Sequence, residues 1–239
     1  MEAKSIRSDA AIRHNQKEEP VRIGSISLKL DYDFENTAGT SAAYVTFKQP
    51  VKILGKPIEL GVWVHGDGGN HWLRGNYINS AGEKKVFDFT KSGGLNWKGW
   101  KYVYVELPQN EKYPIALEQI YLAETAQENK NSGSIYFDDV MAIYKLDKDY
   151  YDPEIVSVLP EGQEIGVIAA DRGYGIDPAS IMMYINDAAV KVKFEPETGK
   201  ISYTPAKPLK KGEYNVRVSL KDKIGHSLNP EFTYTYTVK

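Results

Sequence analysis

The sequence contains no cysteine, which excludes disulfide bonds, thiol catalysis and zinc sites built on cysteine. No apolar run approaches the roughly 18 residues that a membrane-spanning helix needs. The polar first 20 residues lack the apolar core of a signal peptide. Charge of one sign is not in excess either, because 30 lysines and arginines oppose 32 aspartates and glutamates, a net charge of −2. The sequence therefore predicts no membrane span and no nucleic-acid partner.

Apolar and polar residues alternate through most of the chain, which is the pattern of half-buried strands. Turn-forming clusters of glycine, asparagine and serine separate these stretches, and no long helical pattern occurs. Six or more strands at such spacing predict an all-β fold, with a jelly-roll β-sandwich over 21–148. The clearest alternating stretches are 26–34, 60–65, 72–77, 102–107 and 119–123.

A charged, proline-containing stretch at 148–153 marks the predicted domain boundary. Residues 152–239 carry six or seven short strand-like runs, which suit an immunoglobulin-like sandwich. That region has no tryptophan and no cysteine, so it is not an antibody-type domain. We expect residues 1–20 to be a remnant of a preceding strand or a linker.

Large rings and polar groups occupy alternate positions that should be hydrophilic in strands with one buried face. All four tryptophans lie between residues 63 and 100. If the strands that carry these side chains are neighbours in one sheet, they form a single surface of flat rings and hydrogen-bonding groups. Sugars stack their C–H faces on such rings and offer hydroxyls to the polar groups. The predicted glycan-binding residues are Trp63, His65, Trp72, Arg74, Asn76, Trp100, Tyr102, Tyr104, Glu106 and Tyr121.

A second interpretation of these rings stays open, in which they pack under a loop or against another domain. It requires Arg74, Asn76 and Glu106 to be buried in one layer, whereas charged groups are rarely buried unpaired. Two stacked rings at about 1–2 kcal/mol each, with a few hydrogen bonds, correspond to a Kd between about millimolar and micromolar. The predicted site is therefore one of weak binding.

Two adjacent carboxylates, Asp138 and Asp139, lie in an otherwise aromatic and aliphatic strand. Neighbouring strand residues face opposite sides, so Asp139 shares the core side with Phe137. A carboxylate there needs a cation, an arginine or several backbone N–H groups. One prediction is a structural calcium ion held by Asp139 and Asp138. The alternative is an aspartate that caps the amides of a neighbouring turn.

Catalysis is not the favoured function, because Glu106 has no clear second carboxylate to form the pair that glycoside hydrolysis needs. A polysaccharide lyase is the enzymatic alternative, with a histidine and a tyrosine as base and acid and an arginine that neutralises a uronate. Its candidate residues are His65, His71, Arg74, Tyr77, Tyr102 and Tyr104.

Four stretches resemble a carbohydrate-binding-module jelly roll: LGVWVHGDG at 60–68, HWLR at 71–74, NWKGWKYV at 96–103 and IYFDD at 135–139. The resemblance spans roughly 21–145, and it is to the module that follows the catalytic domain in bacterial phosphodiester glycosidases, relatives of N-acetylglucosamine-1-phosphodiester α-N-acetylglucosaminidase. Residues 171–178, 196–205 and 221–226 resemble a bacterial Ig-like module, in which such turns are structural.

The resemblance implies a non-catalytic accessory region of a secreted or cell-wall-associated bacterial glycosidase. That family's catalytic domain is not in the sequence, so its activity does not transfer, and we expect a C-terminal part of a longer protein. The implied partner is a polysaccharide or cell-wall glycan, bound by a monomer. The structural alternative is a spacer whose aromatic face packs on a catalytic domain.

Overall fold

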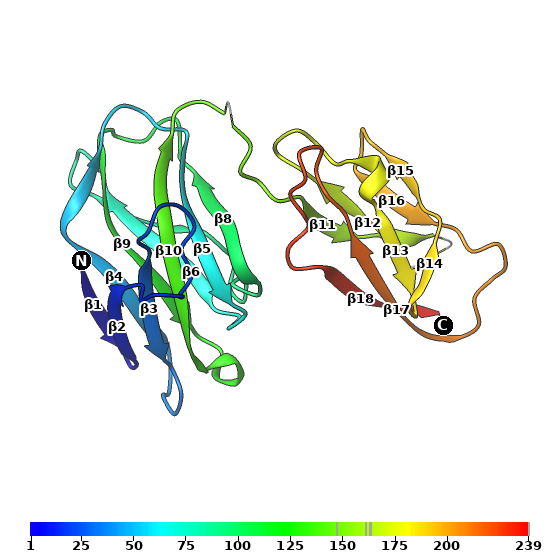
Figure 1. Ribbon diagram of the computed structural model, residues 1–239, viewed down its shortest axis with the longest axis horizontal. Coiled ribbons are helices and arrows are strands. Elements are labelled where there is room, and N and C mark those ends of the chain that lie inside the picture. Colours follow the sequence, from blue (N-terminus) through cyan, green and yellow to red (C-terminus); the bar gives the residue numbers. More distant parts are fainter. Residues whose placement is uncertain (147, 161, 163, 239) are drawn as a thin grey trace. The chain divides into compact units, whose positions relative to one another are not determined.

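The computed structural model describes residues 1–146, 148–160, 162 and 164–238, and most of its regular structure is β-strand. The chain divides into two compact units, Met1–Leu146 and Asp147–Lys239, each with its own hydrophobic core (Figure 1). All strand pairs are antiparallel within the described part of the chain. The prediction of an all-β protein with two sandwiches is thus confirmed. Among the described residues, no helix has the length and apolar character that crossing a membrane requires.

The first domain is a jelly-roll sandwich of two five-stranded sheets. Sheet A has the order β1 (Glu2–Ile6), β4 (Ser41–Ile53), β9 (Ile115–Glu124), β6 (Trp72–Ile78) and β7 (Lys84–Asp88). Sheet B has the order β2 (Asp9–His14), β3 (Leu28–Asp33), β10 (Ser132–Ile143), β5 (Glu59–Asp67) and β8 (Lys98–Glu106). A single 3₁₀ turn, η1 (Gln127–Asn129), precedes β10.

The apolar positions of the alternating stretches form the core between the two sheets. Val62 and Val64 of β5 are fully buried, as are Leu73 of β6 and Leu122 of β9. Since side chains alternate along a strand, the residues between these positions face outward from the sandwich. The outward residues decide what each surface of the domain can bind.

The first 14 residues form edge strands, because β1 pairs with β4 and β2 pairs with β3. The expectation that 1–20 is a remnant or linker is therefore corrected: most of this stretch completes the two sheets of the first domain. Residues 15–27, which we call the covering segment, join β2 to β3. They form the dark-blue loop drawn over β10 in Figure 1.

The second domain is a sandwich of two four-stranded sheets. One has the order β11 (Glu154–Val158), β12 (Ile165–Ala170), β16 (Lys200–Tyr203) and β15 (Lys193–Glu195). The other has the order β14 (Ala188–Val190), β13 (Met182–Ile185), β17 (Gly212–Ser219) and β18 (Phe232–Val238). A short 3₁₀ turn, η2 (Pro178–Ser180), precedes β13. Val167, Ile201, Met183 and Val216 are buried between the two sheets.

Candidate functional site

The predicted glycan-binding residues do not share one surface. Those on β6 and β9 belong to sheet A, and those on β5 and β8 belong to sheet B, so their outward faces lie on opposite sides of the sandwich. The prediction of a single platform is wrong, because alternation shows which side of its own sheet a residue faces but not to which sheet the strand belongs. The sheet A residues are Trp72, Arg74, Asn76 and Tyr121. The sheet B residues are Trp63, His65, Trp100, Tyr102, Tyr104 and Glu106.

On sheet B, the covering segment closes part of the aromatic face. Trp63 is buried at 7% exposure, and the guanidinium carbon of Arg22 lies 4.2 Å from its ring centroid. Tyr102 is also buried, and its hydroxyl donates a hydrogen bond of 2.8 Å to Glu59. For these two rings the structure favours the packing interpretation, and neither offers a free face to a sugar.

The remaining sheet B residues, on β5 and β8, stay partly accessible. His65 and Trp100 are half-buried and meet edge to face, with ring centroids 5.4 Å apart. Burial lowers the pKa of His65 below its ordinary value of 6.5. Tyr104 is half-buried and Glu106 is exposed. This group is a discontinuous fragment of the predicted platform.

On sheet A, four side chains form a continuous outward surface that we call the aromatic cluster: Tyr44, Trp72, Arg74 and Tyr121. Tyr44, Tyr121 and Arg74 are direct cross-strand neighbours on β4, β9 and β6. The two tyrosine rings stack with centroids 4.8 Å apart and planes 28° from parallel. The guanidinium carbon of Arg74 lies 3.9 Å from the Trp72 ring centroid and 5.9 Å from that of Tyr121. Cross-strand register therefore places two stacked tyrosine rings beside Arg74, whose guanidinium lies over the Trp72 ring.

Polar groups border the aromatic cluster on the β7 side. Arg74 pairs with Asp88 at 2.6 Å, which helps to hold the guanidinium over Trp72. Asn76 is buried and its amide donates to the carboxylate of Glu118, which also pairs with Lys84 at 2.6 Å. The hydrogen bond from Lys84 lowers the pKa of Glu118. Asn76 thus orients a carboxylate rather than facing solvent itself.

Sequence reasoning missed Tyr44, although its position carried a signal. Ala43 and Val45 are buried in the core on either side of it, so Tyr44 faces outward by the same alternation that places Tyr121. The neighbouring Ala42 and Ala123 pack beside the rings in a small apolar cluster outside the main core. The short side chains of these alanines do not project beyond the neighbouring rings.

The residues proposed for a lyase do not come together. His71 is fully buried, and its ring nitrogens lie 2.9 Å from Glu124 and 3.0 Å from Asn131, inside the sandwich. Tyr77 is buried and donates its hydroxyl to Glu111 at 2.6 Å. Burial, together with the hydrogen bond to Glu111, raises the pKa of Tyr77, so its hydroxyl is a poor candidate for a base. Arg74 and His65 lie on opposite sheets, so the predicted base and uronate-binding group face different sides.

The predicted calcium ligands have other contacts in this structure. Asp138 Oδ2 accepts the N–H groups of Arg22 at 3.0 Å and Ile23 at 3.2 Å, and Oδ1 accepts that of Asp139 at 2.9 Å. Asp138 therefore fastens the covering segment to β10, which is the amide-capping alternative. Asp139 lies at a break in the β10–β5 register with a φ of 46°, and burial raises its pKa. Calcium at this pair stays a prediction.

No family model matches the chain. One curated relative, a putative flagellar filament outer layer-like protein of Brachyspira hyodysenteriae, is 31% identical over an alignment of 107 residues that covers 41% of this chain. The chain covers 48% of that relative, so it spans about half the length of the curated protein it matches.

Among solved structures, the family 11 carbohydrate-binding module of a Clostridium thermocellum cellulosomal cellulase is similar at a TM-score of 0.36 and 10% identity, covering 62% of this chain and 91% of the module. The glycoside hydrolase domain of Endo-D from Streptococcus pneumoniae is similar at a TM-score of 0.43 and 14% identity, covering 98% of this chain and 37% of that one. TM-scores this low do not establish a shared fold, so the fold assignment rests on the strand pairing described above.

Proposed function

We propose that the first domain binds a glycan, without catalysis, on the outer face of sheet A. The observation that carries this proposal is the aromatic cluster, in which Tyr44, Tyr121 and Arg74 run in register across three strands with Trp72 beside them. Tyr44, Trp72 and Arg74 are half-buried, so each keeps part of its surface open to a ligand, whereas Tyr121 is buried at 8% exposure and supports Tyr44 by stacking. A pyranose has the apolar face to lie on these rings and hydroxyls for the polar groups around them.

Sheet A is preferred over sheet B because of what covers each face. On sheet B the covering segment places Arg22 on Trp63 and is fastened there by Asp138. On sheet A the guanidinium of Arg74 also lies over a ring, 3.9 Å from Trp72, but Arg74 belongs to the sheet and is held by Asp88. Tyr44 and Trp72 stay half-buried there, whereas Trp63 is buried. Carboxylates at that margin, Asp88 and Glu118, are acceptors for sugar hydroxyls.

The wider proposal is that the chain is an accessory region of a secreted or cell-surface bacterial glycosidase, with the second domain as a spacer. It rests on the resemblance of the sequence to the modules of such enzymes and on the scattered positions of the lyase candidates. Binding between about millimolar and micromolar suits a module that raises the local concentration of an enzyme on a polymer. We propose that the chain is monomeric in this role.

The test uses the complete chain on a broad glycan array, followed by titration calorimetry with the best ligand. We expect Tyr44→Ala and Trp72→Ala each to raise the Kd at least tenfold, which corresponds to about 1.4 kcal/mol. Trp100→Ala on sheet B is the matched control, because it removes a half-buried ring of the same size class from the opposite face. Melting temperatures verify that all three variants stay folded.

Two results contradict the proposal. If Trp100→Ala abolishes binding while the sheet A variants bind normally, the glycan site lies on sheet B. If no glycan binds, the second candidate gains support: an assembly role, favoured by the 107-residue match to a putative flagellar filament outer layer-like protein. In that case the aromatic cluster is a protein contact, and light scattering should show self-association that Tyr44→Ala weakens.

A further inference from the structure

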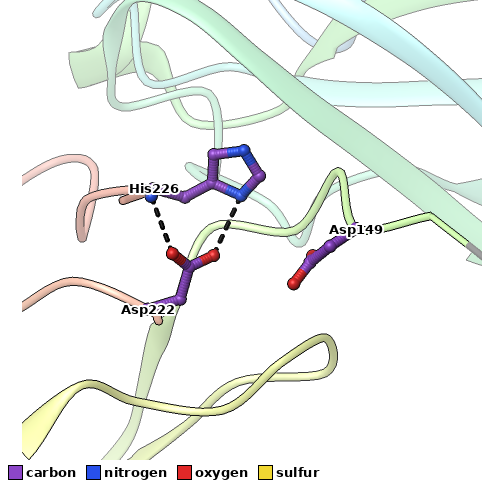
Figure 2. A group of neighbouring side chains, drawn as sticks. All are labelled: Asp149, Asp222 and His226. Carbon is purple, nitrogen blue, oxygen red and sulfur yellow. Dashed lines mark hydrogen bonds and ion pairs between the residues drawn. The ribbon is translucent and has the colours of Figure 1, made fainter. Parts of the chain in front are cut away.

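Three side chains that could ligate a metal meet at one place in the second domain, away from the aromatic cluster. They are Asp149, Asp222 and His226, whose potential ligand atoms all lie within 4.8 Å of one another. Figure 2 shows the carboxylates of Asp149 and Asp222 and the imidazole of His226 around a common point. Asp149 comes from the start of the domain, whereas the other two come from the turn between β17 and β18.

Asp222 is buried at 2% exposure and uses its two oxygens differently. Oδ1 accepts the N–H groups of Ile224, Gly225 and His226 at 2.6 to 2.9 Å, so it shapes the turn. Oδ2 is buried and accepts no well-aligned hydrogen bond, and its contact is the ion pair with the imidazole of His226 that Figure 2 marks with a dashed line. Oδ2 lies 3.0 Å from Nδ1 of His226, and that nitrogen is also 3.1 Å from the carbonyl oxygen of Tyr151. One ring N–H cannot satisfy both acceptors well.

Asp149 is oriented by a backbone N–H of its own segment and by one from the loop after β12. Its Oδ1 accepts the N–H of Tyr151 at 3.0 Å, and its Oδ2 accepts the N–H of Tyr174 at 2.8 Å. A Cβ atom at Gly173 would lie 1.7 Å from Oδ2, so only glycine leaves room for this carboxylate. Each oxygen keeps a second lone pair for another partner.

A third carboxylate increases the negative charge of the region. Asp171 Oδ2 accepts the N–H groups of Gly173 and Gly175, while Oδ1 is buried and has no hydrogen bond. Burial raises the pKa of Asp171, and the charges of Asp149 and Asp222 raise it further. Two buried carboxylate oxygens without a hydrogen bond are costly unless a cation compensates them.

We propose that Asp149, Asp222 and His226 bind one zinc ion, with Asp222 Oδ2 and His226 Nδ1 as its central ligands. An imidazole with two carboxylates is a mixed nitrogen and oxygen set, which suits zinc better than calcium. The 3.0 Å between those two atoms is close to the roughly 3.3 Å between neighbouring ligands of tetrahedral zinc. Metal binding would need the other tautomer of His226: the proton of Nδ1 would move to Nε2, and the hydrogen bond from Nδ1 to the Tyr151 carbonyl would be given up for the metal. The metal would then join the start of the domain to the 222–226 turn.

The test is a zinc titration by calorimetry on the complete chain after removal of metals. We expect one site per chain, with a Kd raised at least tenfold by His226→Gln and by Asp149→Asn. His14→Gln is the matched control, because His14 is exposed and lies in the first domain. The imidazole ¹⁵N resonances of His226 in the unmodified chain give a second readout, and zinc should shift them.

Several results overturn the proposal. These are zinc binding weaker than about 1 mM, binding unchanged in His226→Gln, or saturation with zinc that leaves the His226 resonances in place. Calcium binding in preference to zinc would also overturn it, because it removes the need for the nitrogen ligand. Should His226→Gln unfold, the ¹⁵N measurement on the unmodified chain decides alone.

Discussion

The guanidinium of Arg22 lies over the indole of Trp63, with its carbon 4.2 Å from the ring centroid. These residues are 41 positions apart, yet the backbone N–H of the same arginine also donates to Asp138 at 3.0 Å. A cation–π contact of this kind contributes about 0.5–2 kcal/mol, depending on how far it is removed from water. Arg22 and Asp138 together explain why the Trp63 ring of sheet B is not a binding surface.

Replacing Arg22 should therefore uncover Trp63 without unfolding the domain. We expect Arg22→Ala to shift the tryptophan emission to longer wavelength and to increase quenching by acrylamide. The control repeats the comparison without the Trp63 indole, between Trp63→Phe and Arg22→Ala/Trp63→Phe. These two variants should show the same emission and the same quenching. Unchanged quenching in Arg22→Ala would mean that the rest of the covering segment shields the ring.

The attachment of the covering segment should depend on acidic pH through Glu19. Hydrogen bonds from Arg13 and from the Gln16 N–H lower the pKa of Glu19 from 4.5 to about 2. A lowered pKa means that the stabilisation is complete above about pH 4.5 and is lost as the pH falls towards 2. We expect the difference in melting temperature between the unmodified chain and Glu19→Gln to shrink over that range. A difference that stays constant from pH 5 to pH 2 would contradict this account.

The buried pair of His71 and Glu124 should be a major contributor to the stability of the first domain. His71→Ala removes the partner of Glu124 Oε2 at 2.9 Å, and both side chains are almost completely buried. Breaking such a pair costs about 3–5 kcal/mol, to be measured by urea unfolding. His14→Ala, at an exposed position, should change the free energy of unfolding by less than about 0.5 kcal/mol. Equal effects of the two substitutions would show that the pair is not stabilising.

The calcium prediction for Asp138 and Asp139 is testable separately from zinc. If calcium binds there, adding it to the metal-free chain should raise the melting temperature of the first domain, and Asp139→Asn should abolish the rise. Asp149→Asn, in the second domain, should leave the calcium effect intact. The absence of any shift in the unmodified chain would leave Asp138 with its amide-capping role alone.

The fold was largely predictable because strand alternation is a local property. The stretch around Val62 and Val64 shows in its own residues which side is buried, and it needs no knowledge of the partner strand. The role of 1–20 was not predictable in this way. Its two short strands, β1 and β2, belong to the domain because they pair with β4 and β3, which lie farther along the chain.

The candidate sites show the same division. Trp72 and Tyr121 were correctly placed on outward faces, but Tyr44 was missed because it becomes notable only beside Tyr121. Trp63 was also expected to face outward, and the covering segment closes over it. The cluster of Asp149, Asp222 and His226 joins residues up to 77 positions apart, and no spacing in the sequence indicated it.

Taken by itself, the sequence determined the all-β class, the two sandwiches and the side of its own strand on which each ring lies. Only the tertiary structure decided which strands share a sheet, which aromatic face stays open and which carboxylates meet. The physical reason is the sequence distance over which each interaction acts. Alternation follows from the geometry of a single strand. Which sheet a strand joins, and which face another segment covers, depend on contacts between distant segments, and the local pattern contains no information about those contacts.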